Sequence, residues 1–515
     1  MSRPNIIYIL ADDMGFGDMG CNNPASRIPT PNLDRLAAEG MRFTNAHAPS
    51  SVCTPSRYAV LTGRYCWRSR LRNGIVWQWD AALIEPDRLT VADVLRGQGY
   101  RTACIGKWHL GWDWSLTDGS RANDHVEFGV FGAEGRHTMG ERIDYTQPMR
   151  GGPIDHGFDS YFGDDVPNFP PYTWFEDDHV VTPPTQPKPE QMFGAPGDMV
   201  PDWKLEGVMP ELTRRVVSYL EAADEEPFFL YFPLTAPHTP IVPLDRFRGI
   251  SEAGEYGDYV CEVDWCVGQV FEALERTRKG QDTLLIFTSD NGPENPAYER
   301  IREHGHYSMG DLRGIKRDAW EGGHRVPFLA RWPGVVEAGS TCDHLTTLGD
   351  LLATAAELAG TPVPDGAGPD SVSIGPLLRG GGPVRSCAVH HSMKGKFALR
   401  RGDWVFIDAP SGDDNNEPDW FKAQRGYARG ERRRRAGSTA RLLMCTSPCT
   451  TKAEQCPAMR CVSPRTTKRH AVSGRSSSRE NMASVYGLKC DASSTASTPS
   501  ISSTRHRCST VHAVW

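Results

Sequence analysis

Two pairs of oxygen-bearing side chains each follow directly after a buried apolar run. The pair Asp12–Asp13 follows Asn5–Leu10, and the pair Asp290–Asn291 follows Thr283–Ser289. In open α/β sheets, ligands bind beyond the carboxyl ends of the strands, so the two pairs are expected to converge there. Carboxylate and amide oxygens suit Ca²⁺ or Mg²⁺ better than zinc. Taken alone, each pair is more simply explained as turn residues that end a strand.

Cys53 opens the segment CTPSRYAVLTGR, residues 53–64. Pro55 can begin a helix that ends at Gly63, which would place Cys53 just ahead of a helix N-terminus. The free N–H groups and the helix dipole favour an anion at that position. Arg57, one turn into the helix, adds a permanent positive charge and a two-pronged donor. A lone cysteine is ordinarily a buried thiol, so the surrounding sequence decides the interpretation.

Four further residues carry side chains that could bind or protonate an anion. They are Lys107 and His109 in GKWHLG, His238 in APHTP, and Lys316 in LRGIKRDAWEGGHRVP. Outside a wider pattern, the lysines would be solvated surface charges and the histidines could serve the structure alone. Two lysines and an arginine around a cation site would, however, stabilise the negative charge of a transferring anionic group.

Alternating strands and helices position these residues. Apolar, β-branched runs predict buried strands, and capped amphipathic segments predict helices. The predicted strands are 5–10, 102–105, 228–232 and 283–289, and the predicted helices are 31–39, 90–96, 256–278 and 345–358. This alternation is typical of an α/β sheet with helices on both faces. Residues 119–210, rich in Gly, Pro, Asp and His, are predicted to be long loops, and 404–407 a strand of a smaller C-terminal sheet.

The composition is that of a soluble globular protein of 515 residues, with 39% hydrophobic and 23% charged residues. No run approaches the roughly 20 apolar residues that cross a bilayer. No secretory signal is recognisable in MSRPNIIYILADD, so we expect a cytoplasmic protein. The net charge is -7, although 16 Lys and Arg against 4 Asp and Glu lie from Arg429 to the end. The body is therefore strongly acidic, which argues against a nucleic-acid partner.

The last stretch differs from the rest in kind. From Arg429 it is rich in Ser, Thr, Arg and Cys, with six of the 14 cysteines, and shows neither strand alternation nor helical periodicity. One interpretation is a disordered basic tail. The other is an out-of-frame translation after about Ala428, because disordered tails are seldom this rich in cysteine.

Residues 53–64 match in full the signature by which type I sulfatases are identified, Cys-x-Pro-Ser-Arg followed by Leu-Thr-Gly-Arg. Further blocks resemble the family in its own order and extend the resemblance over roughly residues 4–428. These blocks are NIIYILADDMGFGDMGC, TPNLDRLAAEGMRFTNAH, GKWHLG, APHTP, TSDNGP and LRGIKRDAWEGGHRVP. A Leu-Tyr-Asp-Leu-like segment, which introduces the family's last strand and helix, is missing after Ala428.

The resemblance implies an alkaline phosphatase-like α/β fold, a large mixed sheet sandwiched by helices with a smaller C-terminal antiparallel sheet. It divides the chain into a catalytic domain, 1–375, a partial C-terminal subdomain, 376–428, which is incomplete, and the tail, 429–515. Without its last elements, the small sheet would leave an edge and apolar surface uncovered. A catalytically impaired family member therefore stays an alternative.

The resemblance also assigns a role to each candidate residue. It implies a Ca²⁺ ion, with Mg²⁺ as the alternative, and a sulfate group surrounded by cationic and imidazole side chains. The metal ligands would be Asp12, Asp13, Asp290, Asn291 and the modified Cys53, and the sulfate-binding and catalytic residues Cys53, Arg57, Lys107, His109, His238 and Lys316. Cys53 would be oxidised to 3-oxoalanine (formylglycine) by a formylglycine-generating maturation enzyme, a transient partner.

The implied reaction is the hydrolysis of a sulfate ester through a covalent step. One hydroxyl of the hydrated Cys53 aldehyde would attack sulfur, and His238, with or without Lys316, would protonate the leaving alcohol. The second hydroxyl, deprotonated with help from His109, would then expel sulfate. A phosphonate monoester or phosphodiester hydrolase of the same superfamily is the nearest rival, since a phosphate ester would also fit a cationic site.

Aromatic residues bear on the choice of substrate. Six of the 14 tryptophans lie in a short stretch, as Trp67, Trp77, Trp79, Trp108, Trp112 and Trp114. Their indoles could stack on the ring of an aryl or carbohydrate sulfate, or they could simply pack loops onto the sheet. The sequence leaves aryl and carbohydrate sulfates equally open.

Overall fold

A buried parallel strand, β1 (Asn5–Ala11), forms the centre of the molecule. The computed structural model describes residues 3–427 and 442–445, and there β1 lies between two parallel partners, β10 (Phe228–Pro233) and β11 (Thr283–Ser289). Successive side chains of a strand point to opposite faces. Accordingly, Ile6, Tyr8 and Leu10 join one apolar core, and Ile7, Ile9 and Ala11 join a second core on the other face. A strand covered on both faces explains the continuous apolar run.

Ten of the described strands form one mixed sheet, in the order β13-β2-β12-β11-β1-β10-β4-β5-β6-β7. The strands from β11 to β5 are parallel to one another, and β12 and β6 pair antiparallel at either side of this block. The remaining bounds in this sheet are β2 (Met41–Phe43), β4 (Arg101–Ile105), β5 (Ser160–Gly163), β6 (Phe175–Glu176), β7 (His179–Val180), β12 (Phe328–Arg331) and β13 (Ser340–Cys342). Two small two-stranded sheets pair β3 (Ala46–His47) with β14 (Thr346–Thr347) and β8 (Gln186–Pro187) with β9 (Asp198–Met199).

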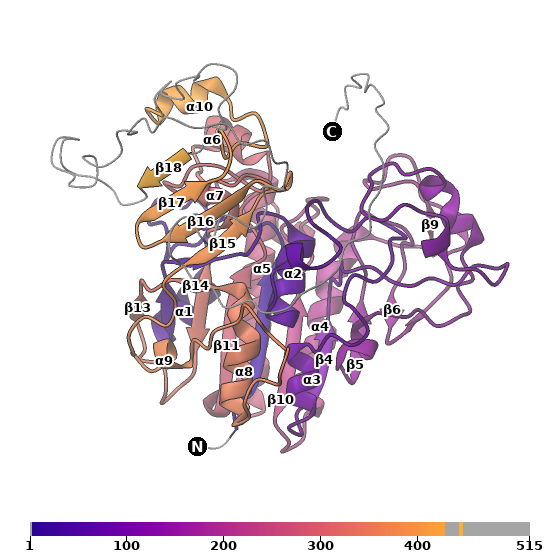
Figure 1. Ribbon diagram of the computed structural model, residues 1–515, viewed down its shortest axis with the longest axis horizontal. Helices are drawn as coiled ribbons and strands as arrows, with labels where there is room; N and C mark the ends of the chain where they lie inside the picture. The colour runs from indigo at the N-terminus through magenta and orange to yellow at the C-terminus, as the bar shows by residue number, and fades with distance from the viewer. Residues whose placement is uncertain (1–2, 428–441, 446–515) are drawn as a thin grey trace, which may run out of the picture. The chain divides into compact units, whose positions relative to one another are not determined.

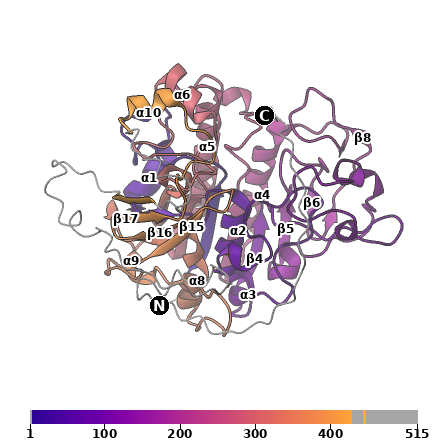
Figure 2. The same cartoon turned by 45° about the horizontal axis from the view of Figure 1, so that its top comes forward.

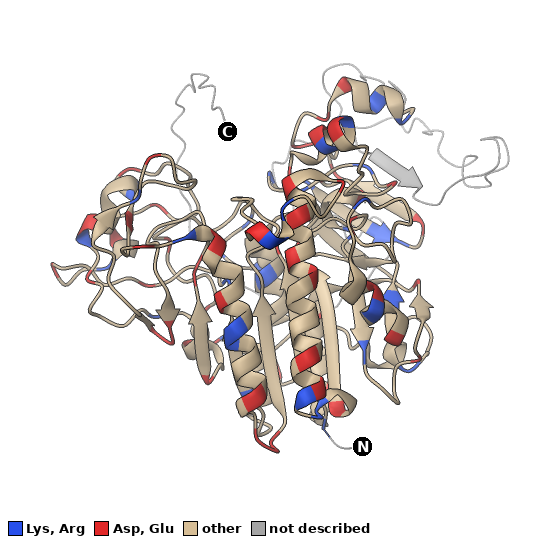
Figure 3. Cartoon of the chain, turned by 180° about the vertical axis from the view of Figure 1, so that it is seen from behind, with Lys and Arg blue, Asp and Glu red and all other residues tan. Residues whose placement is uncertain are grey.

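Helices cover both faces of this sheet (Figure 1). On one face, the apolar core includes residues of α2 (Cys53–Thr62), α3 (Val91–Arg96) and α8 (Leu351–Ala359). On the other face it includes residues of α1 (Pro31–Glu39), α4 (Val208–Ala222) and α5 (Gly254–Arg276). Figure 3 shows this second face, where two long helices carry their charged residues on the outside. The predicted α/β sandwich is confirmed.

Most predicted elements are confirmed to within two residues, including the strand at 404–407 and the helix at 31–39. Two predictions need correction. The helix predicted at 345–358 begins only at Leu351, because β14 and a 3₁₀ turn occupy its first residues. The stretch 119–210, predicted as loops, contributes β5, β6 and β7 to the main sheet. Strands of two to four residues are too short to show alternation.

A second, smaller antiparallel sheet follows near the end of the described chain. Its strands are β15 (Ala388–His391), β16 (Phe397–Arg401), β17 (Trp404–Ile407) and β18 (Leu442–Cys445), in that order. Figure 2 shows β15 running close to α2, and a β-bridge between Ser50 and His391 joins the two regions. The short helices α6 (Ala297–His304) and α10 (Asp419–Gln424) share an apolar cluster, and α7 (Glu321–His324) and α9 (Gly375–Leu378) complete the helices of the described chain.

Strand β18 corrects the interpretation of the tail. Residues from Arg429 onward were predicted to hold no strand, yet 442–445 pair antiparallel with β17 as the fourth strand of the small sheet. The rest of 429–515, and with it the choice between a basic tail and an out-of-frame translation, lies outside the described residues. The boundary between 375 and 376 stays a prediction.

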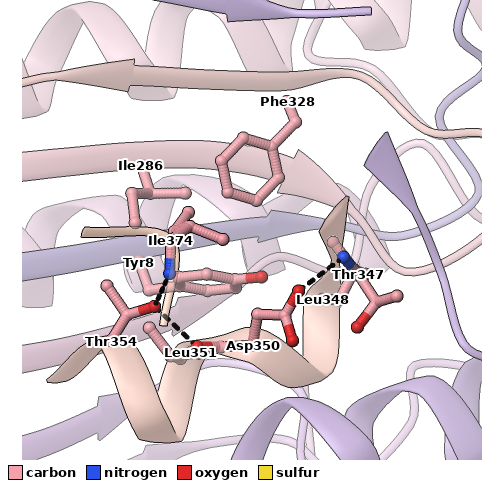
Figure 4. A pocket seen from close by; sticks show the side chains of 9 residues that line it. All are labelled: Tyr8, Ile286, Phe328, Thr347, Leu348, Asp350, Leu351, Thr354 and Ile374. Atoms are coloured by element: carbon pink, nitrogen blue, oxygen red, sulfur yellow. Dashed lines mark hydrogen bonds between the residues drawn. The ribbon is translucent and has the colours of Figure 1, made fainter. Parts of the chain in front are cut away.

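A small internal cavity lies between α8 and the main sheet (Figure 4). Tyr8, Ile286 and Phe328 line it from the strands, and Asp350, Leu351 and Thr354 line it from the region of the helix. The Tyr8 hydroxyl is buried there without a hydrogen-bond partner among the described residues. A cavity of this kind holds about one water molecule. None of the predicted site residues lines it, so we assign it to the core.

Three buried histidines lie where the small sheet meets the main body. His47 from β3, His324 from α7 and His390 from β15 bring ring nitrogens within 4.8 Å of one another. The His324 and His390 rings stack in parallel, with centroids 4.0 Å apart, so one ion cannot lie in the plane of both rings. The nearby Arg325 and Arg400 also disfavour a cation, although Glu321 offsets one charge. We therefore interpret the cluster as structural.

Hydrogen bonds define the neutral tautomers of this cluster. His47 Nε2 lies 2.9 Å from Asn45 Oδ1 and therefore donates, which leaves its Nδ1 to accept from His324 Nδ1 at 3.1 Å. Burial lowers the pKa of His324 to about 4, where Arg400 and Arg325 act with it against Glu321. Burial likewise holds the pKa values of His47 and His390 well below their usual range.

We expect this cluster to make the fold acid-labile. Below about pH 6.5 these histidines bind protons in the unfolded chain but not in the folded one. Each histidine therefore lowers the free energy of unfolding by roughly 1.4 kcal/mol for every unit by which the pH falls. For His324 the loss continues down to about pH 4. Urea unfolding of wild type and His390→Phe between pH 7.5 and 5.5 tests this, since phenylalanine keeps a stacked ring without a titrating nitrogen. The variant should lose stability less steeply, and equal slopes would contradict the assignment.

No helix in the described part of the chain combines the length and the apolar character that a bilayer crossing requires.

Candidate functional site

Four adjacent parallel strands bring the candidate residues to one edge of the main sheet. In the sheet order β11-β1-β10-β4, the first two strands lead directly into the pairs Asp290–Asn291 and Asp12–Asp13. The other two lead into His238 and into the loop that holds Lys107 and His109. The ladder continues past the strand ends, because Asp290 N donates to Ala11 O and Asp12 N donates to Ala236 O, each at 3.0 Å. The predicted convergence is therefore observed.

Cys53 is the first residue of α2, a helix whose ten residues are all buried. The helix was predicted to begin at Pro55, but it begins two residues earlier, at Cys53. It does not extend further back, because Val52 is in the extended conformation, with φ −146° and ψ 154°. Gly63 ends it in the left-handed conformation, at φ 61°, which a glycine adopts at little cost. The positive end of the helix dipole lies at this first turn, so a negative charge is favoured at the Cys53 side chain.

Oxygen atoms of the two pairs lie close together without enough donors to satisfy them. Ligand atoms of Asp12, Cys53 and Asp290 lie within 4.8 Å of one another, and all three residues are buried. Asn291 Nδ2 donates to Asp13 Oδ1 at 2.7 Å, which leaves Asn291 Oδ1 without a partner among the described residues. Asp12 Oδ1 accepts no hydrogen bond from the described residues either, although Arg57 NH2 lies 3.4 Å away. Hard oxygens left without hydrogen bonds beside further carboxylates fit a Ca²⁺ or Mg²⁺ ion.

The electrostatics of these carboxylates also fit a bound cation. Burial raises the pKa of Asp290 well above its usual range, and the negative charge of Asp12 adds to that rise. Burial acts in the same direction on Asp12, but Lys107, His238 and Arg57 outweigh it and hold the Asp12 pKa well below normal. Buried carboxylates this close together require compensating positive charge.

Three cationic side chains pair with these carboxylates. Lys107 Nζ lies 2.5 Å from Asp12 Oδ2, and Lys316 Nζ lies 2.8 Å from Asp13 Oδ2. The Arg57 guanidinium is fully buried and lies 2.9 Å from Asp290 Oδ2 through its NH2 group. Burial lowers the pKa of Lys316, but Asp13 outweighs it and keeps the pKa above normal, so the side chain stays charged at neutral pH.

His109 offers an unprotonated nitrogen to the site. Its Nε2 lies 3.0 Å from Val76 O and must donate, so Nδ1 carries a lone pair, and this nitrogen has no partner among the described residues. Burial and then Lys107 lower the His109 pKa to about 3, so the ring is neutral at neutral pH. His109 also has a left-handed backbone, at φ 54°, as Asp13 does at φ 67°. Such conformations are uncommon in residues other than glycine and often mark functional positions.

His238 lies nearest to solvent among the candidate residues, with 12% of its side chain exposed. Its Nδ1 donates to Thr239 O at 2.5 Å, and its Nε2 faces the site, 3.7 Å from Asp13 Oδ2. Burial and then Lys316 lower its pKa to about 4, and Asp13 and Asp12 oppose that shift. An anionic substrate beside the ring would raise this pKa.

Three acidic residues at the site were missed in the sequence. Glu294 pairs with Arg317 and lies 3.6 Å from Lys316 Nζ. Asp164 and Asp165 follow β5 directly, as Asp12 and Asp13 follow β1. Burial raises the pKa of Asp164 to about 7, with Lys107 opposing it, and Asp165 accepts from His109 N at 3.0 Å. An acidic pair after an apolar run was the available signal, but the run Tyr-Phe-Gly was too short to indicate a strand.

Comparison with known proteins places the chain in a family. A family model described as Sulfatase matches residues 4–361. The chain is 34% identical to an N-acetylgalactosamine-6-O-sulfatase of Bacteroides thetaiotaomicron, over 79% of this chain and 84% of that one. It is 36% identical to human arylsulfatase A, over 78% of this chain and 74% of that one.

A solved structure gives the same result for the fold. It comes from work on the metabolism of glycosaminoglycans by Bacteroides thetaiotaomicron, is 32% identical, and superposes with a TM-score of 0.68 over 79% of this chain and 88% of that one. The chain therefore belongs to the sulfatase family and is a hydrolase of sulfuric esters.

Proposed function

We propose that this sulfatase cleaves its ester with a formylglycine made from Cys53, beside a Ca²⁺ ion held by Asp12, Asp13, Asp290 and Asn291. The observation that carries the proposal is the position of Cys53. It stands at the first turn of a buried helix, and its Sγ is within 4.8 Å of ligand oxygens of Asp12 and Asp290. Mg²⁺ fits the same donors, so metal affinity decides between the two ions.

The formylglycine and the metal ion would each supply one kind of chemistry. A formylglycine at position 53 supplies the nucleophilic oxygen, and the metal acts as a Lewis acid on that oxygen and on the sulfate. Because an unmodified cysteine requires a maturation step, a formylglycine-generating enzyme is proposed as a transient partner.

The cationic residues bind and orient the sulfate. Lys107 and Lys316 each place an ammonium group at the edge of the carboxylate cluster, and Arg57 lies beneath it. These charges are held in place before the reaction, so they stabilise the charge that develops on the sulfate oxygens without reorganising. Their burial excludes water, which strengthens that interaction.

The two histidines are assigned the two proton transfers of the reaction. His109 accepts a proton at Nδ1, because its other nitrogen is held by Val76 O. His238 keeps the proton on Nδ1 for Thr239 O, so it delivers a proton from Nε2 to the leaving alcohol or phenol as the imidazolium, a form that the anionic substrate stabilises. Lys316 stays charged and assists the departure of the leaving group electrostatically.

Turnover of matched esters tests the proposal. The enzyme is produced in cells with formylglycine-generating activity, freed of metal, and assayed with 4-nitrophenyl sulfate, a 6-sulfated N-acetylhexosamine and bis(4-nitrophenyl) phosphate. We expect sulfate release that returns on addition of Ca²⁺, and at most a minor rate with the phosphodiester. A preference for the phosphodiester would favour the phosphodiesterase alternative. Converted protein that binds Ca²⁺ but releases no sulfate would indicate an impaired family member.

A further inference from the structure

The six clustered tryptophans divide into two groups in the structure. Four of them are buried in the core on the α2 face of the sheet, namely Trp79, Trp108, Trp112 and Trp114. These four pack loops onto the sheet, which was one of the two roles that the sequence left open for the tryptophans. Only Trp67 and Trp77 are partly exposed. Trp67 stacks on Tyr65 and meets Phe397 of the small sheet edge-on.

Trp77 belongs instead to a row of aromatic rings that begins at His109. The Phe169 ring meets the His109 ring edge-on at 5.9 Å and lies 5.9 Å from the Trp77 ring. The Phe131 ring covers Trp77 at 4.7 Å. Exposure increases along this row, from buried His109 through half-buried Phe169 and Trp77 to Phe131, which is 53% exposed. The row therefore runs from the site toward solvent.

Three hydrogen bonds join the inner end of the row to α2. Thr54, the neighbour of Cys53, donates from Oγ1 to His109 O at 3.1 Å and accepts from Val76 N at 3.2 Å. Val76 O in turn accepts from His109 Nε2. Because Trp77 follows Val76 directly, the position of its backbone is coupled to that of Cys53.

The chemistry of the row differs from that of the buried site. Arg57, Lys107 and Lys316 surround the site with positive charge, whereas the row consists of three partly exposed aromatic rings on loops. Partly exposed aromatic rings bind flat apolar ring faces, and the rim beside them can take polar groups. The sulfate ester of a ring alcohol or a phenol has the same two parts, an anion at one end and a ring face at the other.

We propose that Trp77, Phe169 and Phe131 form the subsite for the leaving group of the ester and select substrates whose alcohol or phenol is a six-membered ring. The shared chemistry is a ring face stacked on indole and phenyl rings, which a pyranose and an aryl group both provide. The inference rests on the proposed function, which assigns the sulfate a position next to His109, at the inner end of the row.

Binding measurements on enzyme that keeps Cys53 as a thiol test this inference independently of the conversion of Cys53 to formylglycine. The full-length enzyme is produced without formylglycine-generating activity, so that Cys53 stays a thiol, and is titrated calorimetrically in the presence of Ca²⁺. The ligands are a 6-sulfated N-acetylhexosamine, 4-nitrophenyl sulfate and inorganic sulfate. Trp77→Ala should weaken the binding of at least one ring ester by about 10-fold or more and leave inorganic sulfate unchanged. Trp77→Phe should restore much of the loss.

A matched control is available in Trp67→Ala, which removes an equally half-buried indole on the side of the small sheet. This variant should bind all three ligands as wild type does. A larger loss for the hexosamine ester in Trp77→Ala identifies a pyranose subsite, and a larger loss for 4-nitrophenyl sulfate identifies an aryl subsite. Equal affinities of Trp77→Ala and wild type for both ring esters, or failure of wild type to bind either ester more tightly than inorganic sulfate, would overturn the inference.

Discussion

Replacing Cys53 by serine will lower the multiple-turnover rate of sulfate release by about 10⁴-fold or more. Serine has nearly the same size, and the Cys53 side chain is buried at the start of α2, so the fold should be kept. A maturation enzyme that oxidises only a cysteine thiol leaves serine as an alcohol, so the aldehyde that the proposed nucleophile requires does not form. The measurement is the steady-state rate with a chromogenic sulfate ester, together with the circular dichroism spectrum of each protein.

Cys261→Ser is the matched control for this substitution. Cys261 lies in α5, and its Sγ donates to Pro29 O at 3.6 Å. A serine hydroxyl can keep that hydrogen bond. The control variant should turn over at the rate of wild type. Near-normal sustained turnover by Cys53→Ser would contradict the role assigned to this residue, because the chemistry would then need only a hydroxyl.

Replacing Lys316 by alanine will lower kcat by about 10²- to 10³-fold, the range typical for loss of one preorganised group that stabilises developing charge. The ammonium group is nearly fully buried against Asp13, and its raised pKa keeps it charged across the working pH range. KM should change less than kcat, because the charge it stabilises grows toward the transition state. Initial rates over a range of ester concentrations separate the two constants.

Lys396→Ala controls for the loss of a partly buried ion pair elsewhere. Lys396 Nζ lies 2.8 Å from Asp414 Oδ1, and Lys396 is not one of the candidate site residues. Its substitution should affect stability and leave kcat unchanged. A Lys316→Ala enzyme with wild-type kcat and a raised KM would mean that Lys316 only helps to bind the ester, and the proposed role in the transition state would be wrong.

The central parallel strands and the residues that follow them could be predicted because their signals are local. A continuous apolar run followed by an acidic pair specifies a buried strand and a ligand at its end, and β1 and β11 both follow that pattern. The predicted strands gave the neighbours β11, β1, β10 and β4, but the sequence could not give their order across the sheet. That order is what brings Asp12, Lys107 and Asp290 into contact.

Other features of the site depend on tertiary contacts and could not be predicted. The lone pair on His109 Nδ1 exists because Val76 O accepts from the opposite nitrogen, and these residues lie far apart in the sequence. The pairing of Glu294 with Arg317 likewise requires two loops to meet. Strand β18 was missed because its four residues carry no alternation, and pairing with β17 alone makes them a strand. Which of the six tryptophans are buried could not be predicted either, because their burial depends on which loops pack over them.

Mass spectrometry of the tryptic peptide Phe43–Arg57 tests the proposed nucleophile most directly, in protein produced with formylglycine-generating activity. We expect a peptide in which the Cys53 thiol has been replaced by an aldehyde, which a hydrazide reagent then captures. The same peptide from cells without that activity should retain a thiol that reacts with iodoacetamide. An unmodified Cys53 in protein that hydrolyses sulfate esters, with a second sulfatase converted in the same cells, would contradict the proposed nucleophile.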